Sequence, residues 1–415
     1  MTKDSRVHLN QSLIAHQQKC AAFVPELSNN KNSEERIQIY KQAFSKNDEL
    51  WIFLCDALQK QENQALEDGV KTVFRHTTRN QKDIINWENA FTVLSSCLLE
   101  WGALHRELCP DFYESSVYLS DLYFLDYRYS PENRFSFAQQ NQFQDKDQVK
   151  NFLEKTFASW GLAEQFKRIE FVHDPQKSIC ASGERIQDRT IAKINLNDPY
   201  GRDQIDQLAT LFHETGHCME WFGAETRAEM PPLVHEPYSE IGSRFFEWLY
   251  LFEIAKNLLN AEQQTLWGQE VRRQWVYSWC ASVFSILFEW EARQLFQRGC
   301  RDQVEYARLY QRLRERAYGL NPLYKLEEGD FSFLYRDVVY WIFEPFKLRS
   351  YLIGSIYFPA LLGLWQGLED KQQFLSLIAP TKESPELPAW SAQLGVPLSD
   401  KTFSRKELIR IFSFM

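Results

Sequence analysis

Two histidines and a glutamate near the middle of the chain have a spacing suited to binding a metal ion. They lie in the run Leu-Phe-His213-Glu214-Thr-Gly-His217-Cys-Met, which contains no proline. Residues four apart share one face of a helix, so both imidazoles can point at one ion. Glu214, next to the first histidine, can hold a water molecule beside that ion. The alternative is a helix that carries two surface or capping histidines.

A catalytic zinc site needs a third protein ligand and keeps one coordination position open. Glu240 follows His217 by 23 residues, enough for a loop and a returning helix, and we expect it to be that ligand. His235 and Glu236 are nearby competitors, and His235 could instead donate a hydrogen bond to a substrate. Glu247 lies two helical turns after Glu240 on the same face, where we expect a solvated carboxylate rather than one that supports a ligand.

The flanking sequence predicts the elements that would hold these residues. Apolar residues recur at helical spacing around His213. Upstream, two β-branched segments, Ile169–His173 and Thr190–Leu196, predict short strands, and the small-residue segment Lys177–Gly183 between them predicts a loop. The other main predicted helices are Glu34–Leu58, Trp87–Leu108, Asp145–Trp160, Arg244–Asn260, Glu262–Arg298, Val304–Tyr318, Leu334–Gln366 and Lys406–Phe414, with Gly268, Gly299 and Pro359 as candidate breaks.

The composition excludes several classes of protein. Among 415 residues there are only 16 glycines and 15 prolines, which excludes collagen-like and low-complexity chains. The 15% aromatic content predicts a large core, so global disorder is excluded as well. The net charge of −9 supplies no basic excess for a nucleic-acid partner.

Other features predict a cytoplasmic protein with no membrane partner. The eight cysteines are scattered and form no Cys-x-x-Cys pair, which favours reduced thiols. The N-terminus is polar and lacks the apolar core of a signal peptide. The longest mostly apolar run, Tyr351–Trp365, is fifteen residues long, shorter than the roughly 20 that a membrane span needs.

Pro131 marks a possible boundary. We expect an N-terminal helical region over residues 1–135 and a metallopeptidase-like catalytic domain over residues 136–415. Pro380, Pro385, Pro388 and Pro397 predict exposed turns near the end of the chain.

Beyond these patterns, the sequence resembles the thimet oligopeptidase and oligoendopeptidase F family of zinc metallopeptidases. The resemblance rests on Gly216 before the second histidine, on the segment Ser239–Trp248 (SEIGSRFFEW), and on Ile191–Asn197 (IAKINLN) upstream. It covers about residues 165 to 415. It implies a mostly α-helical fold enclosing a deep cleft, with a small β element beside the zinc helix, and one zinc ion held by His213, His217 and Glu240.

The same resemblance implies zinc-dependent hydrolysis of amide bonds in short peptides or peptide-like molecules. Glu214 would be the general base on the zinc-bound water and would later protonate the leaving amine. The oxyanion that forms in this reaction needs hydrogen-bond donors. Tyr351 is the first candidate for that role, followed by Arg349, Tyr357 and His235.

The chain departs from the family at a late motif where a histidine precedes several tyrosines. Trp341 stands where the histidine is expected, or Tyr340 if the register shifts by one, and no histidine follows His235. Two other functions therefore stay open: a narrow metal-dependent enzyme acting on one small metabolite or modified peptide, and a zinc-binding protein without turnover. The intact Glu214 argues against the latter, because a site without catalysis needs no general base.

Overall fold

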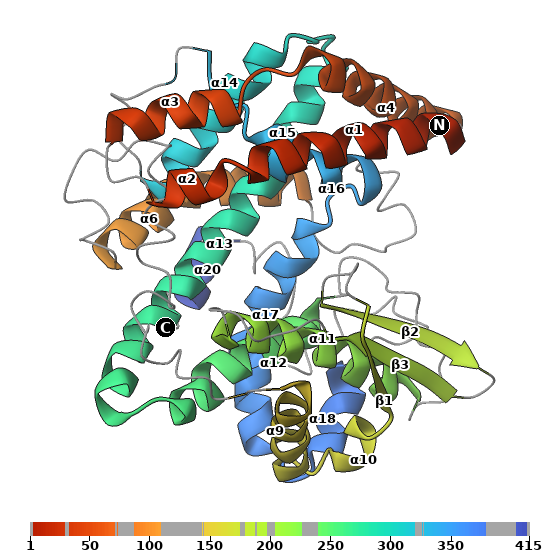
Figure 1. Cartoon of the computed structure of the whole chain (residues 1–415), viewed down its shortest axis with the longest axis vertical. Helices are drawn as coiled ribbons and strands as arrows, with labels where there is room; N and C mark the ends of the chain where they lie inside the picture. Colours follow the sequence, from red (N-terminus) through yellow and green to blue (C-terminus); the bar gives the residue numbers. More distant parts are fainter. Residues whose placement is uncertain are drawn as a thin grey trace. The chain divides into compact units, whose positions relative to one another are not determined.

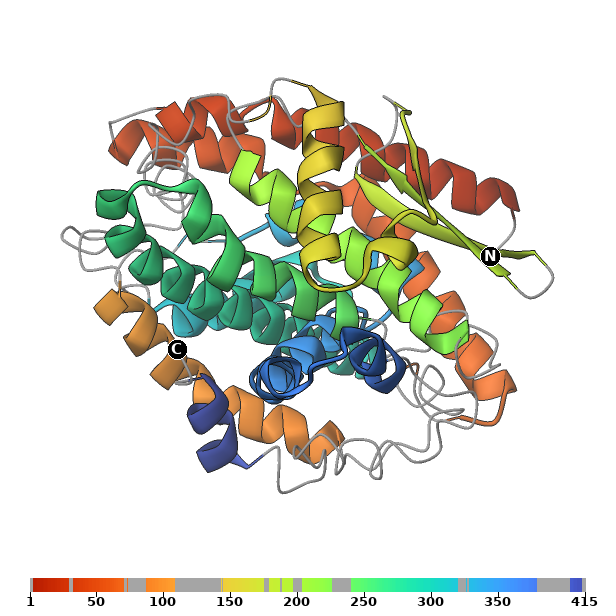
Figure 2. The same ribbon diagram turned by 90° about the horizontal axis from the view of Figure 1, so that it is seen from below.

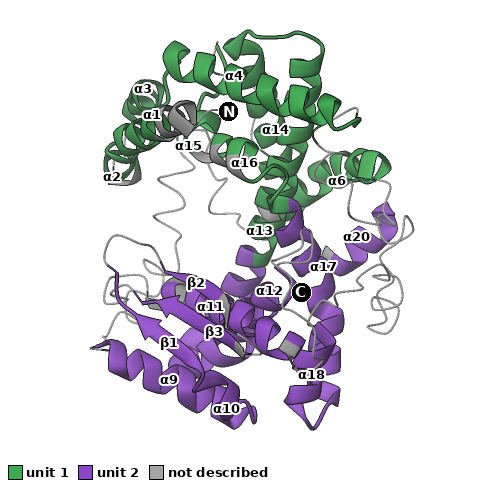
Figure 3. Ribbon diagram, turned by 90° about the vertical axis from the view of Figure 1, so that its right-hand side faces the viewer, with its two compact units in different colours: residues 1–133, 275–348 green, residues 134–274, 349–415 purple. Residues whose placement is uncertain are grey.

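The chain folds into two compact units, each assembled from separate stretches of sequence. We describe them from a computed structural model. One unit contains residues 1–133 and 275–348, and the other contains residues 134–274 and 349–415 (Figure 3). The structure describes residues 3–29, 33–70, 73, 87–108, 143, 145–174, 179–186, 189–196, 204–225, 240–319, 326, 328–378 and 404–412.

The first unit is helical, and aromatic side chains fill its core. Trp51, on α4, lies edge-on to Tyr306, with ring centroids 4.6 Å apart. Phe288 packs against Phe333 and Trp341 at 5.4 and 4.9 Å. Its described helices are α1 (Lys3–Ala21), α2 (Val24–Asn29), α3 (Ser33–Ala43), α4 (Asp48–Glu67), α6 (Trp87–Leu108), the second half of α13 (Ala261–Gln297), α14 (Gln303–Tyr318), α15 (Phe333–Arg336) and α16 (Val338–Phe343), coloured in Figure 1.

The second unit combines helices with a sheet in the order β1-β3-β2. The sheet consists of β1 (Ile169–Val172), β2 (Cys180–Ile186) and β3 (Arg189–Asn195). β1 runs parallel to β3 and β2 runs antiparallel to it, which leaves β2 at one edge. The helix α11 (Gln204–Glu225) packs against β2 and β3 (Figure 2).

The second unit contains further helices. They are α9 (Lys146–Ser159), α10 (Ala163–Phe166), α12 (Ile241–Leu249) with a π-helical turn at Tyr250–Ile254 and a 3₁₀ turn at Ala255–Leu258, the first half of α13, α17 (Leu348–Gly367), α18 (Lys371–Ile378) and α20 (Arg405–Phe412). Of these, α12, α18 and α10 contact α11. Phe212 of α11 stacks on Phe157 at 5.7 Å and on Tyr250 at 4.6 Å. The predicted mostly α fold, with a small β element beside the motif helix, is confirmed.

Two predicted helices are interrupted. The segment predicted as Leu334–Gln366 forms the three helices α15, α16 and α17. The break between α16 and α17 contains Phe346, which follows Pro345 and adopts a left-handed backbone with φ of 62°. The backbone N–H of Phe346 donates to Glu289 at 2.9 Å, which fixes this turn. The segment predicted as Glu34–Leu58 is divided between α3 and α4. By contrast, Gly268 and Pro359 lie inside continuous helices, whereas Gly299, with φ of 88°, follows the end of α13.

One predicted loop was wrong in part. Residues 180–183 of the segment Lys177–Gly183 belong to β2, because pairing with β3 extends a sequence that has little strand character of its own. Residues 175–178, Pro131, the expected boundary at residue 135 and the four late prolines lie outside the described residues. None of the described helices combines the length and the apolar character that crossing a membrane requires.

Candidate metal centre

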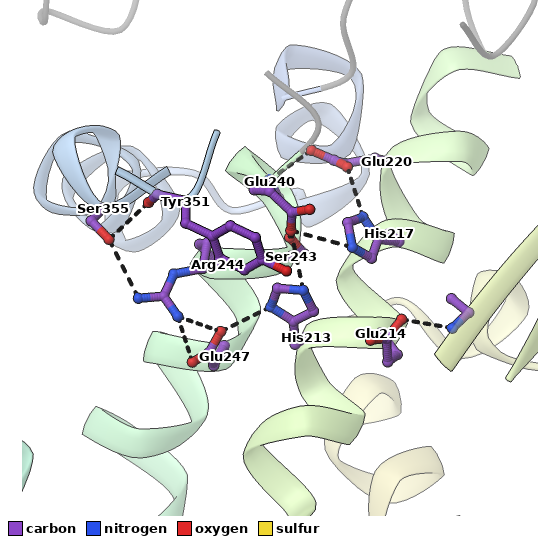
Figure 4. A network of polar contacts seen from close by, with 12 residues as sticks. His213, Glu214, His217, Glu220, Glu240, Ser243, Arg244, Glu247, Tyr351 and Ser355 are labelled. Carbon is purple, nitrogen blue, oxygen red and sulfur yellow. Dashed lines mark hydrogen bonds and ion pairs between the residues drawn. The ribbon is translucent and has the colours of Figure 1, made fainter. Parts of the chain in front are cut away.

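Two helices of the second unit bring three metal-ligating side chains together. His213 and His217 lie one turn apart on α11, and Glu240 immediately precedes α12. Glu240 Oε2 lies 3.1 Å from His213 Nε2 and 3.4 Å from His217 Nε2 (Figure 4). The three ligand atoms all lie within 4.8 Å of one another, and the Glu240 side chain is only 3% exposed.

This donor set fits one zinc ion. Tetrahedral bonds of about 2.0–2.1 Å place neighbouring ligand atoms about 3.3 Å apart. Both measured distances to Glu240 Oε2 are within a few tenths of an ångström of that value. Two imidazoles and one carboxylate also leave the fourth position for water or substrate.

A close approach of α11 to α12 creates this geometry, and Gly216 permits it. A Cβ on Gly216 would lie 2.6 Å from Ser243 Cα and 2.8 Å from the Gly242 carbonyl oxygen. Both atoms belong to the backbone, so no rotamer change could relieve the contact. The glycine before the second histidine therefore determines how near Glu240 comes to both imidazoles.

Two further carboxylates orient the histidine rings. Glu247 Oε2 accepts a hydrogen bond from His213 Nδ1 at 2.8 Å, and Glu220 Oε2 lies 3.7 Å from His217 Nδ1. With each Nδ1 turned toward a carboxylate, each Nε2 is directed at Glu240, which is the arrangement that metal-binding histidines require. The expectation that Glu247 is solvated was wrong, because its side chain is only 18% exposed and contacts a ligand.

The electrostatics of the cluster favour a cation. Burial disfavours the charged form of His213, but hydrogen bonds to Glu240 and Glu247 outweigh it and raise the pKa of His213. For His217 burial acts in the same sense, but the adjacent carboxylates of Glu220 and Glu240 outweigh it and raise its pKa to about 10. Burial would raise the pKa of Glu240, yet its two imidazole partners hold it well below the usual range. The site therefore stabilises positive charge next to an ionised Glu240.

Glu214 lies beside the ligands and faces the sheet. Its Oε2 accepts a hydrogen bond from the backbone N–H of Ala181, on the edge strand β2, at 2.6 Å (Figure 4). The side chain is only partly buried, so it can be reached by water. A carboxylate that is held in place beside the cluster and is open to water could act as a general base.

Tyr351 reaches the cluster from α17. Its ring lies parallel to the His213 imidazole, with centroids 5.9 Å apart and planes 9° apart. Arg349 and Tyr357 are fully buried on the same helix. From the same helix, Ser355 accepts a hydrogen bond from Arg244 Nη2 at 3.4 Å.

The remaining expected residues either are outside the described part of the chain or belong to the first unit. His235 and Glu236 are outside the described residues, as is the side chain of Tyr340. Trp341, for which the resemblance predicted the position of the late histidine, packs in the core of the first unit, where its carbonyl oxygen accepts a hydrogen bond from Arg293.

Sequence reasoning assigned no role to Glu220 or Arg244. Arg244 Nη1 donates to both Glu247 oxygens, at 2.7 and 2.8 Å. For Glu220, its position three residues after His217 was an available signal, because residues three apart in a helix are neighbours. The same spacing relates Arg244 to Glu247, but the contacts of Arg244 with Ser355 and Tyr351 on α17 had no local signal.

Comparison with known proteins identifies the fold. No protein-family model matches the sequence, and no curated protein matches it. Among solved structures, a protein assigned as a peptidase from Chlamydophila abortus has a TM-score of 0.59 and 13% identity, over 100% of this chain and 75% of its own. A protein assigned as an oligoendopeptidase F from Bacillus anthracis has a TM-score of 0.61 and 13% identity, over 100% of this chain and 74% of its own.

A third structure, PZ peptidase A with an inhibitor, has a TM-score of 0.63 and 12% identity, over 100% of this chain and 77% of its own. The chain has the fold of these peptidases. At such low identities the similarity shows the fold alone, so the chemistry of this chain has to be argued from its own site.

Proposed function

We propose that the chain is a zinc-dependent peptidase that hydrolyses amide bonds in short peptides. The observation that carries this proposal is the convergence of His213, His217 and Glu240, with Glu214 beside them, in a chain that has the fold of peptidases. One zinc ion would be held by the two Nε2 atoms and Glu240 Oε2.

The residues around the proposed zinc ion have separate roles in the reaction. A bound zinc ion would supply Lewis acidity, which polarises the scissile carbonyl and acidifies water. Glu214 takes the proton of the attacking water and delivers it to the leaving amine. The Ala181 N–H holds the Glu214 carboxylate in place at 2.6 Å, while Glu247 holds the His213 ring.

Tyr351 is our candidate donor to the oxyanion. Its ring lies against His213, and it projects from α17 toward the ligands (Figure 4). A hydroxyl on this ring can donate to an oxygen that becomes negatively charged beside the metal. Arg349 and His235 remain further candidates for contact with the substrate.

A second candidate function is favoured by the missing late histidine. No histidine follows His235, and Trp341 packs in an aromatic core. Because the chain's hydrogen-bond donors to the oxyanion would differ from those of the family, the same zinc chemistry could be restricted to one small metabolite or modified peptide. The two functions share the metal centre and Glu214, and they differ in the range of substrates.

Two measurements test the proposal. Purified wild-type protein should hold about one zinc ion, and His213→Ala should lose it because one of three ligands is removed. A zinc content below half an equivalent that does not change in His213→Ala would refute the metal centre.

The reaction is tested by incubating the zinc-loaded protein with a mixed library of short peptides and identifying products by mass spectrometry. Glu214→Gln is the matched control, because it keeps the shape of the side chain and removes the base. Cleavage of many sequences by the wild type alone supports the peptidase. Cleavage of none, with full zinc content, would overturn it; loss of a cellular phenotype in Glu214→Gln would then favour the narrow enzyme over a zinc-binding protein without turnover. We also propose that the protein is located in the cytoplasm.

A further inference from the structure

Arg244 connects the metal ligands to α17. It lies on α12, four residues after Glu240 and three before Glu247, and is only 6% exposed. Its Nη1 donates to both Glu247 oxygens, at 2.7 and 2.8 Å, and Oε2 of that carboxylate also accepts from His213 Nδ1. Glu247 is therefore held between a guanidinium and the imidazole of a ligand (Figure 4).

The other side of the guanidinium faces α17. Arg244 Nη2 donates to Ser355 Oγ at 3.4 Å, and Ser355 in turn donates to the Tyr351 carbonyl oxygen at 3.0 Å. The guanidinium carbon also lies 5.8 Å from the centre of the Tyr351 ring and 5.1 Å from that of Trp248. The ring that stacks on His213 is thus in contact with Arg244 as well.

The backbone brings α17 close enough for these contacts. A Cβ on Gly354 would lie 2.5 Å from the Glu240 carbonyl oxygen and 2.9 Å from Cβ and Cγ of Arg244. Only a glycine fits between the two helices here. Arg244 therefore has a fixed stem, and its charged end has a defined set of partners.

We propose that Arg244 is a positioning residue that fixes Glu247 on His213 and Tyr351 above the same imidazole. This inference rests on the proposed zinc peptidase function. Arginine suits the role because Nη1 donates to both carboxylate oxygens, Nη2 reaches Ser355 on another helix, and the flat guanidinium packs on aromatic rings. A lysine has the charge but only one nitrogen, so it cannot reproduce both contacts and the flat face. Without the guanidinium, the Glu247 carboxylate would lose both hydrogen bonds from Arg244 and its defined orientation.

The test compares Arg244→Met and Arg244→Lys with a matched control in the same unit. Arg273 makes the same kind of buried contact, with Nε 3.0 Å and Nη2 2.6 Å from Glu270 oxygens three residues earlier on α13, and it contacts no proposed ligand in the described residues. Zinc affinity of the full-length protein is measured by competition with a chromophoric chelator. The amount of folded protein is checked by circular dichroism.

We expect Arg244→Met to weaken zinc binding by about 10- to 100-fold, the usual effect of losing support behind a histidine ligand. Arg244→Lys should recover part of this loss, and it carries the comparison if Arg244→Met does not fold. Arg273→Met should change zinc affinity less than about twofold, since it removes a similar pair without touching a ligand.

A double-mutant cycle separates positioning from general destabilisation. If Arg244 acts through Glu247, adding Arg244→Met to Glu247→Gln should weaken zinc binding by less than about twofold. If the two substitutions weaken zinc binding independently, so that their fold-changes multiply, the inference is overturned. Wild-type zinc affinity in Arg244→Met would overturn it as well. A protein that binds zinc normally but cleaves no peptide would refute the peptidase and leave this result standing. A wild type that binds no zinc would overturn both.

Discussion

Gly216→Ala should weaken zinc binding without altering a single ligand. The new Cβ would lie 2.6 Å from Ser243 Cα, whereas ordinary carbon contacts begin at about 3.4 Å. Because the obstructing atoms are backbone on both sides, α11 and α12 would have to separate by about 0.8 Å. Both histidines lie on one of these helices, and Glu240 starts the other.

The expected magnitude follows from that separation. Added to the present distances of 3.1 and 3.4 Å, it moves Glu240 Oε2 to about 4 Å from both imidazoles, beyond the roughly 3.3 Å that tetrahedral zinc permits. Overpacking by itself costs about 1–3 kcal/mol. If about 1.4 kcal/mol of this cost arises only when zinc draws the two helices together, the affinity for zinc falls about tenfold.

The assay measures zinc affinity by chelator competition and thermal unfolding with and without zinc. Zinc at 100 times its dissociation constant stabilises a protein by about 2.7 kcal/mol. A tenfold weaker site at the same zinc concentration would lose about half of this. The melting temperature of Gly216→Ala should therefore respond less to added zinc than that of the wild type.

Gly268→Ala is the matched control. It introduces the same methyl group inside α13, in the same unit, where no atom lies within 4 Å of the new Cβ. It should raise stability by about 1 kcal/mol through helix propensity and leave zinc affinity unchanged. Gly216→Ala with wild-type zinc affinity would show that the distance between the helices does not control the site, and would refute this reasoning.

Two further predictions concern other parts of the chain. Tyr351→Phe should lower kcat for peptide cleavage by about 10²–10³ and leave zinc affinity unchanged, because the ring keeps its place on His213; wild-type kcat would eliminate Tyr351 as the oxyanion donor. Burial raises the pKa of Glu62, despite hydrogen bonding from Gln297, so its ionisation costs stability above that pKa. Glu62→Gln should melt higher than the wild type at pH 7, and the difference should shrink as the pH falls through the raised pKa; a constant difference would show that this titration is not responsible.

The features that the sequence predicted well depend on local geometry. His213 and His217 lie on the same helix, so their spacing alone places both imidazoles on one face. The helix Trp87–Leu108 was predicted with the bounds that the structure has, because its apolar residues keep one period throughout. Predicting Glu240 as a ligand required one further assumption, that the chain returns to the two histidines where α12 begins.

The features that were missed depend on contacts between elements. The strand β2 begins with Cys-Ala-Ser-Gly, which has little strand propensity, and it forms because β3 offers a pairing partner. The role of Glu247 was missed because nothing in the spacing of α12 shows that His213 Nδ1 faces it from another helix. The break at Phe346 had a signal in Pro345, but the continuous apolar pattern concealed it.

The contact between α11 and α12 connects these observations. The spacing within α11 determines how the two imidazoles relate to each other, but the distance to Glu240 depends on how closely the helices approach. Two contacts control that approach: Gly216 leaves room for Ser243, and Glu220 Oε1 accepts the Gly242 N–H at 2.6 Å. The other oxygen of Glu220 faces His217, so one carboxylate links the helix contact to the orientation of a ligand. Zinc affinity should therefore depend on Gly216 and Glu220, which are not ligands, as well as on the three ligands themselves.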